Sequence, residues 1–286
     1  MTKLLLTGAR GFVGSYFLKK YTSCHFIQTF SFLNDDLAML HVKDVDVVVH
    51  LSALVHQMSG ASAAAYEDIN VTQTLALAHK AKESGVEHFI FMSTVKVYGE
   101  ESDEVYTENF TCKPQDEYGK SKLKAEKELQ KLEGEHFKVS IVRTPVVYGY
   151  GVKANLKNLM ILVDKVPVLP FGSINNRRSL TYVGNLCALL ECIIQKQQRG
   201  IFLASDDKAL STTQLIEAIT TVKKRSCWLF SFPFFPQLLK WLKPSFYKRL
   251  FESLEVDNQA TKRILSFENP YTVEEGIRFM VHGEKQ

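Results

Sequence analysis

The stretch TGARGFVG, from Thr7 to Gly14, decides the fold of this chain. It follows an apolar run over residues 3–7, which predicts a strand, and leads into a helical pattern over residues 14–21. Gly8 permits a tight turn there, Gly11 lets a pyrophosphate approach the backbone, and Gly14 permits close packing of the helix on the strand. Glycines in this setting predict a dinucleotide site at the N-terminus of the first helix.

Beyond this stretch, short apolar runs alternate with helical patterns. The run VDVVVHL at 45–51 has no polar alternation, as in strands that helices cover on both faces. We therefore expect an α/β fold, a Rossmann-like doubly wound parallel sheet. Further strands are predicted at 25–30, 88–93 and 139–143, and helices at 71–84, 118–132 and near 212–222.

The character of the chain changes after about residue 148, where prolines interrupt shorter elements. We expect an NAD(P)-binding Rossmann domain over residues 1–150, completed by returning segments from the C-terminal half. Residues 151–286 would form mainly a smaller substrate-binding portion. No internal repeat is present.

Composition excludes several classes of protein. The chain has 286 residues, 45% hydrophobic and 23% charged, which is ordinary for a globular protein. Its net charge of +4 suits an anionic substrate, and we expect no nucleic-acid partner. The five cysteines are odd in number and lack Cys-x-x-Cys spacing, which predicts no metal site and a reducing cytoplasm. We expect neither a secretory signal nor a transmembrane segment, because the first residues hold only three consecutive leucines and the longest uncharged aromatic stretch is too short to span a bilayer.

The choice between NAD and NADP stays open from the residues. An acid that binds the adenosine ribose normally ends the second strand, about 20 residues after the glycines. Here that strand ends with QTFS at 28–31, and the first acids are Asp35 and Asp36. Arg10, inside the glycine loop, would meet a 2′-phosphate or else lie in solvent.

A candidate proton-transfer pair lies in YGKSK at 118–122. Tyr118 and Lys122 are four residues apart on one helix face, where a cation favours the phenolate. Tyr16 and Lys20 have the same spacing, but they follow the glycine loop and are predicted to be framework or surface. Thr94, at the carboxyl end of a predicted strand, favours Tyr118 because catalytic groups gather at such ends.

These motifs together resemble the extended short-chain dehydrogenases/reductases of the NAD-dependent epimerase/dehydratase family, close to UDP-4-keto-6-deoxy-N-acetylhexosamine 4-reductases and UDP-sugar 4-epimerases. TGARGFVG, HLSA (50–53), STVKVYG (93–99) and YGKSK appear in the family's order. RTPVVYG (143–149), RRSLTYVGN (177–185) and SLEVDNQATKRIL (253–265) extend the resemblance over nearly the whole chain.

The resemblance implies a role for each matching residue. Tyr118 would be the acid/base, Lys122 would bind the nicotinamide ribose and lower the tyrosine pKa, and Arg143 would be structural. Asn70 would help to hold the active-site architecture. The implied substrate contacts are Thr94, Lys96, Tyr118, Asn155 and Arg178, the last two holding a nucleotide diphosphate. The implied cofactor contacts are Gly8, Arg10, Gly11, Phe12, Val13, Gly14, Asp36, Leu37, Leu51, Ser52, Ala53, Asn70 and Lys122.

Departures from the family pattern narrow the expected chemistry. Val95 and Lys96 replace the Asp-Glu pair of 4,6-dehydratases, and Val146 replaces an asparagine found in many 4-epimerases. We expect a UDP-sugar 4-keto reductase of bacterial polysaccharide synthesis. The alternatives are a UDP-glucose or UDP-GlcNAc 4-epimerase with tightly bound NAD, and a non-catalytic dinucleotide sensor. A homodimer through the helices at 71–84 and 118–132 is also expected.

Three further features have competing interpretations. Residues 222–250 hold seven basic residues and no acid, interleaved with aromatic side chains. This segment would be a packed small domain with a basic rim and a lid contribution, which we favour, or a weak contact with an anionic membrane surface. His56 and Met58 would border the sugar or be exposed. Arg177 is expected to point away from Arg178, because side chains alternate in extended chain.

Overall fold

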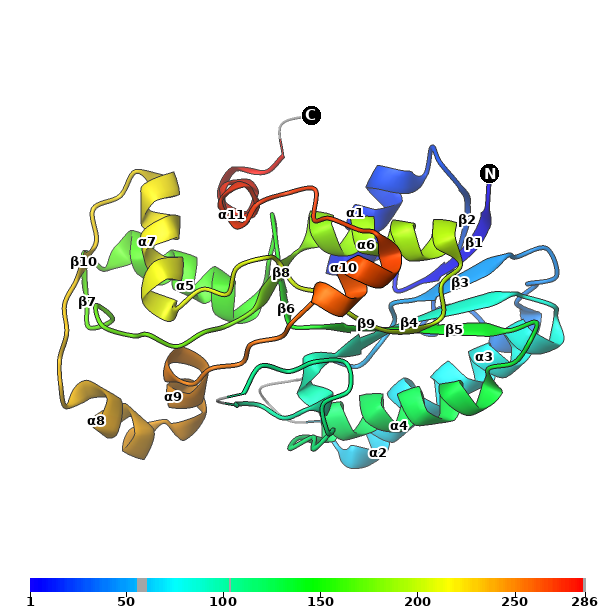
Figure 1. Ribbon diagram of the computed structural model, residues 1–286, viewed down its shortest axis with the longest axis horizontal. Helices are drawn as coiled ribbons and strands as arrows, with labels where there is room; N and C mark the ends of the chain where they lie inside the picture. Colours follow the sequence, from blue (N-terminus) through cyan, green and yellow to red (C-terminus); the bar gives the residue numbers. More distant parts are fainter. Residues whose placement is uncertain (56–60, 103, 285–286) are drawn as a thin grey trace.

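The computed structural model describes residues 1–55, 61–102 and 104–284. A parallel sheet of six strands, in the order β2-β1-β3-β4-β5-β9, forms its centre (Figure 1). The α/β fold predicted from the alternating pattern is confirmed. The strands are β1 (Lys3–Thr7), β2 (Phe26–Phe30), β3 (Val47–His50), β4 (His88–Thr94), β5 (Lys138–Thr144) and β9 (Gly200–Leu203).

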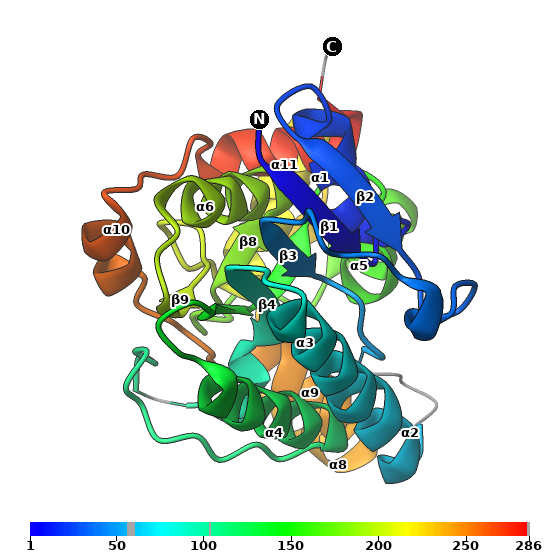
Figure 2. The ribbon, with the colours of Figure 1, turned by 90° about the vertical axis from the view of Figure 1, so that its right-hand side faces the viewer.

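Helices cover both faces of this sheet, as Figure 2 shows. Alternate side chains of β1 enter different cores: Leu4 and Leu6 pack with α1 and α6, whereas Leu5 packs with α3 and α4. This two-sided burial explains why the strands read as continuous apolar runs. The helices of these layers are α1 (Phe12–Tyr21), α2 (Ala63–Glu67), α3 (Gln73–Glu83), α4 (Glu117–Leu132) and α6 (Val183–Lys196).

The strand order reverses at β1, which lies between β2 and β3. The chain runs from β1 out to the edge strand β2 and then returns to the other side of β1. Ligands of open α/β sheets bind at the carboxyl ends of the strands at such a reversal. The glycine loop after β1 therefore lies where a dinucleotide is expected.

The second half of the chain both completes the sheet and builds a smaller part beside it. Strand β9 pairs with β5, which agrees with the predicted returning segments, while the boundary near residue 150 stays a prediction. Two short sheets pair β6 with β8 and β7 with β10. The strands are β6 (Val146–Tyr148), β7 (Val168–Leu169), β8 (Leu180–Tyr182) and β10 (Trp228–Leu229). The helices are α5 (Ala154–Lys165), α7 (Thr212–Lys223), α8 (Phe235–Leu242), α9 (Pro244–Phe251), α10 (Gln259–Leu265) and α11 (Val273–His282).

The favoured interpretation of residues 222–250 as a packed small domain holds for only one side of α8 and α9, where Phe235, Leu250 and Phe251 pack against the main core. No residue of these two helices, both described in full, is completely buried. Trp241 is 80% exposed and Phe234 is 74% exposed. The segment has aromatic side chains on more than one side, and only one side can pack on the protein. Within the described residues, no helix is both long and apolar enough to cross a membrane.

Candidate active site

The glycine loop has the backbone geometry that a pyrophosphate requires. Gly8 has a φ of +70°, and a Cβ there would lie 2.8 Å from the backbone nitrogen of Ser52. A Cβ at Gly14 would lie 2.3 Å from the carbonyl oxygen of Gly8, which confirms the close approach predicted for Gly14. Helix α1 begins at Phe12 with Gly11 as its N-cap and no acid in its first turn. These residues fit the pyrophosphate of a dinucleotide, because the first N–H groups of α1 suit an anion.

The remaining loop contacts implied by the resemblance are distributed around this turn. Arg10 is exposed, while Phe12 and Val13 are half-buried against the main core. After β2, Asp36 caps a short 3-10 turn that begins at Leu37, and its carboxylate accepts a hydrogen bond from the Ala38 N–H at 2.9 Å. The choice between NAD and NADP at this end stays open.

A buried histidine that the sequence analysis gave no role joins three elements beside the loop. His50, the last residue of β3, has Nδ1 2.7 Å from the Thr7 hydroxyl and Nε2 2.9 Å from the Thr74 hydroxyl. The Thr7 hydroxyl also accepts a hydrogen bond from the Ser52 N–H at 3.2 Å. Burial, and then the charge of Lys122, lower the pKa of His50 to about 3, so the ring is neutral. The segment 51–53, predicted to line the cofactor, is thus tied to the end of β1.

Asn70 connects this segment to the helix that carries the tyrosine. Its Oδ1 accepts from the Leu54 N–H at 2.8 Å, and its Nδ2 donates to the Leu54 carbonyl and the Ser121 hydroxyl at 3.0 Å each. The Ser121 hydroxyl in turn donates to the Tyr118 carbonyl. Asn70 lies on a π turn (Asp68–Thr72), a form that is frequent at functional sites. These contacts are compatible with the role in architecture that the resemblance implied for Asn70, which stays a prediction.

The structure brings Thr94 and Tyr118 together at the carboxyl end of β4. Asp116 caps α4 by accepting a hydrogen bond from the Gly119 N–H at 2.7 Å, which fixes the first turn of the helix. The Thr94 side chain is a hydrogen-bond partner of the Tyr118 hydroxyl. One turn later, Lys122 is 1% exposed, and its Nζ lies 3.9 Å from the centre of the Phe91 ring.

The pKa values of Tyr118 and Lys122 differ from those expected from the sequence. Burial raises the pKa of Tyr118 above its usual value, Asp116 and Tyr66 raise it further, and only the Thr94 hydrogen bond lowers it. Burial lowers the pKa of Lys122 to about 7, against the opposing charge of Glu126. The expectation that Lys122 lowers the tyrosine pKa is therefore corrected: desolvation dominates, and Tyr118 is a protonated phenol at neutral pH.

A buried ion pair forms one helical turn beyond Lys122, and the sequence analysis did not identify its acidic residue. Glu126 is 1% exposed and holds Arg143, which is 4% exposed, at 2.6 Å. The guanidinium also donates to the Tyr98 hydroxyl at 2.7 Å, and Ser93 donates to Glu126. The available signal was the spacing, since Glu126 follows Lys122 by four residues on one helix face. The structural role implied for Arg143 is confirmed.

Among the predicted substrate residues, Lys96 lies beside the start of α4, whereas Asn155 and Arg178 lie near α9. Lys96 forms ion pairs with Asp116 at 2.6 Å and with Glu100 at 2.9 Å, so it supports the cap of α4. A substrate contact of Lys96 stays a prediction. Asn155 is exposed, and its Oδ1 accepts from Arg249 at 3.4 Å.

The two adjacent arginines face different ways. Arg178 is half-buried and donates to the Glu252 carbonyl at 2.9 Å, and burial lowers its pKa. Arg177 is exposed and forms a two-bonded pair with Glu255. The predicted divergence of the two side chains is confirmed. Asn155 and Arg178 both contact the region of α9, and a diphosphate contact stays a prediction.

Comparison with known proteins settles the family. Residues 4–203 match the NAD dependent epimerase/dehydratase family. The chain belongs to this family. It is therefore an NAD-dependent enzyme of the epimerase/dehydratase group, and the resemblance seen in its motifs is confirmed.

Three proteins illustrate the similarity. UDP-glucose 4-epimerase of Vibrio cholerae is 35% identical over 96% of this chain and 93% of its own length. The N-acetyl-α-D-glucosaminyl-diphospho-ditrans,octacis-undecaprenol 4-epimerase of Escherichia coli O157:H7 is 27% identical over 76% of this chain and 71% of its own. The crystal structure of UDP-glucuronic acid 4-epimerase from Bacillus cereus with NAD superposes with a TM-score of 0.79 at 20% identity, over 99% of this chain and 98% of that one.

Within this epimerase/dehydratase enzyme, the second Tyr–Lys pair is framework at Tyr16 and surface at Lys20, both of which were expected. The Tyr16 hydroxyl donates to Glu284 at 2.5 Å, and Tyr182 donates to the same carboxylate. Tyr16 thus ties α1 to the C-terminal segment. His56 and Met58, weighed as neighbours of the sugar, lie outside the described residues.

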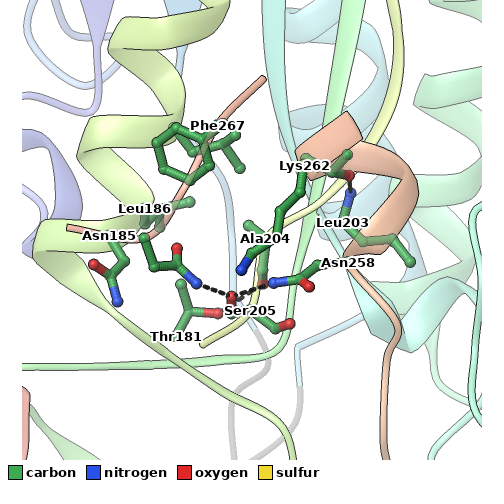
Figure 3. Close-up of a pocket in the computed structure, with 12 residues that line it drawn as sticks. Thr181, Asn185, Leu186, Leu203, Ala204, Ser205, Asn258, Lys262 and Phe267 are labelled. Carbon is green, nitrogen blue, oxygen red and sulfur yellow. Dashed lines mark hydrogen bonds between the residues drawn. The ribbon is translucent and has the colours of Figure 1, made fainter. Parts of the chain in front are cut away.

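A small cavity of the epimerase/dehydratase chain is structural rather than a ligand site. Figure 3 shows that it lies between β8, α6, β9 and α10, and its volume of about 10 Å³ holds no more than one water. Asn258 and Asn269 both donate to the Ser205 carbonyl, at 2.8 and 3.0 Å. These bonds fasten α10 and the segment after it to the sheet. In the described part of the chain, no group of three or more His, Cys, Asp or Glu side chains could hold a metal.

Proposed function

We propose that this enzyme is a 4-epimerase of a UDP-linked sugar. The observation that carries the proposal is the 35% identity to a UDP-glucose 4-epimerase over nearly the full length of both chains. Two observations support chemistry at a carbon that bears a hydroxyl group. Thr94 is a hydrogen-bond partner of Tyr118, and the glycine loop fits a dinucleotide. The relatives favour this function over the 4-keto reductase expected from the sequence.

The proposed reaction removes and returns one hydride and one proton at C4. Bound NAD supplies the acceptor and the donor of the hydride. Tyr118, as phenolate, takes the proton of the C4 hydroxyl, and Thr94 orients that oxygen through its own hydroxyl. The 4-keto sugar then turns over in the site, and the Tyr118 phenol returns the proton to the oxygen as the hydride returns to the other face. Atoms and electrons balance with no net change in the cofactor.

The charge state of Lys122 would determine whether Tyr118 can act as a base. Its ammonium is almost fully buried, with Glu126 one turn away as the carboxylate that favours the charged form. A charged Lys122 stabilises a neighbouring phenolate, and a neutral one does not. Tyr118 is a phenol in the free protein, which is the form that serves the second half-reaction; the first half-reaction requires its phenolate, which a charged Lys122 favours.

The test is a comparison of cofactor balance in two reactions. The purified enzyme is incubated with UDP-glucose or UDP-GlcNAc without added reductant, and with a UDP-4-keto-6-deoxy-N-acetylhexosamine plus NADH or NADPH. The proposal predicts C4 epimers in the first reaction with no net oxidation or reduction. Stoichiometric consumption of reduced cofactor only in the second reaction would make the enzyme a reductase and refute the proposal.

A second candidate is the same C4 chemistry on a sugar diphosphate that a membrane lipid carries. The Escherichia coli relative named above acts on such a compound by its name. The observation that favours this candidate is an exposed apolar and basic surface on α8 and α9, whose residue Arg249 contacts Asn155. Epimerisation of an undecaprenyl-diphospho-sugar, but not of UDP-sugars, would select it.

The homodimer through α3 and α4 and the cytoplasmic location stay predictions. The outer face of α4 carries lysines in ion pairs, such as Lys120 with Glu117 and Lys124 with Glu67. A dimer through this face would be polar, and sizing chromatography at low and high salt tests it.

A further inference from the structure

Helix α8 has two apolar faces, and only one of them packs on the protein. Phe235 packs on Phe171 and Phe251, at ring-centre distances of 5.9 and 6.3 Å, which anchors the helix. On another face Phe234, at the N-cap, is followed by Leu238 and Trp241 at spacings of four and three residues. These spacings align side chains along one side of a helix.

The side chains on the second face are far more exposed than apolar residues of their size normally are. On this face Phe234, Leu238 and Trp241 are 74, 49 and 80% exposed, and Leu242, the last residue of α8, is 58% exposed. Phe232, before the helix, and Phe246, on α9, are also about half exposed. We call these six residues the α8–α9 surface. Exposed apolar residues grouped in this way mark an interaction site.

The charged residues of the segment that carries the α8–α9 surface are all basic. Residues 222–250 contain no Asp or Glu, although the whole chain has 31. Lys240 and Lys243 are exposed, and neither forms an ion pair with a carboxylate of the described residues; the Lys240 Nζ lies 5.4 Å from the centre of the Tyr247 ring on α9. Aromatic tips between unpaired lysines are the pattern of helices that lie in the headgroup layer of an anionic membrane.

The α8–α9 surface also adjoins the candidate substrate residues. Arg249, on α9, donates to Asn155, and Lys248 pairs with Glu101 at 2.6 Å. The chain after α9 supplies the Glu252 carbonyl that holds Arg178. In Figure 1 the two helices lie at the end of the molecule remote from β1 and β2. A partner that binds the α8–α9 surface would therefore lie close to the predicted diphosphate contacts.

We infer that the α8–α9 surface docks this enzyme on an anionic membrane, with Phe234 and Trp241 in the headgroup layer and Lys240 and Lys243 at the lipid phosphates. The inference does not rest on the proposed epimerase function, because the exposed apolar side chains and the charge of the α8–α9 segment carry it whatever reaction the site performs. Charge complementarity selects the occupant: a stretch with unpaired lysines and no acid matches phosphatidylglycerol or cardiolipin.

Vesicle sedimentation tests the docking. The full-length protein should bind phosphatidylglycerol-containing vesicles at least about tenfold more tightly than pure phosphatidylcholine vesicles, and added salt should weaken the binding. The double variant Phe234→Glu/Trp241→Glu should lose at least about tenfold in affinity. Leu33→Glu is the matched control, because Leu33 is 93% exposed in the loop after β2 and should bind as the parent protein does.

A second pair of variants isolates the charge. Lys240→Gln/Lys243→Gln should weaken binding about 30-fold, about fivefold for each lysine, because a basic residue near the surface contributes about 1 kcal/mol. Lys19→Gln/Lys20→Gln, on the exposed end of α1, should change it less than about twofold. Thermal unfolding of every variant checks that the fold is intact.

Tryptophan fluorescence reports the site directly, since the chain has only Trp228 and Trp241. In a Trp228→Phe protein, anionic vesicles should shift the emission of Trp241 to shorter wavelength, and brominated lipids should quench it. Equal binding to both vesicle types, or unchanged binding by Phe234→Glu/Trp241→Glu, would overturn the inference. A protein that binds no vesicles but forms a dimer that Trp241→Glu dissociates would overturn it too, by assigning the surface to a second copy of the chain.

Discussion

Replacing Lys122 by methionine should make the protein more stable at neutral pH and remove its activity. Lys122 is 1% exposed, and burial lowers its pKa from 10.5 to about 7. A group whose pKa is lower in the folded state binds its proton more readily in the unfolded chain. The folded protein is therefore least favoured at low pH, and its stability rises as the pH increases from about 7 to about 10.5.

The size of the effect follows from the pKa difference. Each unit corresponds to about 1.4 kcal/mol, so the fall from 10.5 to about 7 destabilises the native state by about 4 to 5 kcal/mol at or below neutral pH. Methionine keeps the length of the side chain without the charge. It loses the attraction between the ammonium and the Phe91 ring, which is worth about 2 kcal/mol when buried. We expect a net gain of about 2 to 3 kcal/mol near pH 7.

Urea unfolding of the parent protein and Lys122→Met at pH 7 and pH 10 measures this difference. The gain should be largest at pH 7 and should decline by about 1.4 kcal/mol per pH unit toward pH 10.5. Lys122→Arg is the control: it keeps a buried charge and should show no gain. A Lys122→Met protein that is less stable than the parent by the same amount at both pH values would refute the reasoning, because burial would then not penalise the lysine.

Three further variants test the supports of the site. Arg143→Leu should lower the free energy of unfolding by about 3 to 5 kcal/mol, because it strands a buried carboxylate, and Arg143→Leu/Glu126→Leu should recover most of that loss in urea unfolding. Equal losses in the single and double variants would contradict the pairing. Asn70→Ala should cost about 2 to 4 kcal/mol and lower kcat, since two backbone groups of Leu54 lose their partner; unchanged kcat would contradict its positioning role. Gly119→Ala places a Cβ 2.8 Å from the Lys96 carbonyl and should cost about 1 to 3 kcal/mol and reduce activity, whereas full stability would show that α4 can shift freely.

The sheet was predictable because its residues act locally. Strands buried on both faces carry uninterrupted apolar runs, and the observed β1 and β4 agree with the predicted ranges to within one residue. The roles of Gly8 and Gly14 were predictable for the same reason. Gly8 has a positive φ and Gly14 closely approaches the backbone of Gly8, and glycine is the residue that fits both positions.

The rest of the site depends on contacts between distant residues. His50 reads as one more residue of an apolar strand, and its two hydroxyl partners come from other elements. From the sequence, Glu126 is expected to be a surface charge on a lysine-rich helix, because its partner Arg143 lies 17 residues later on another element. The raised pKa of Tyr118 was also hidden, because sequence spacing gives the neighbouring cation but not the burial that outweighs it.

Composition alone could not place α8 and α9. Aromatic residues among basic ones are compatible with a core, a lid or a membrane contact, and the choice is made by which sides are covered. Phe235 is covered by Phe171, whereas Trp241 projects into solvent. That difference arises only after folding.

The most direct test of the account is the fate of the C4 hydrogen when the enzyme acts on UDP-glucose or UDP-GlcNAc in heavy water. Proton NMR follows the parent protein, Tyr118→Phe, and Tyr16→Phe as the matched tyrosine control. We predict that the parent and Tyr16→Phe form the C4 epimer without deuterium at C4, because the same hydride returns, and that Tyr118→Phe forms at least about a hundredfold less. Epimer formation by Tyr118→Phe at the parental rate, or deuterium at C4, would contradict the claim that Tyr118 moves the proton while hydride leaves and returns at this carbon.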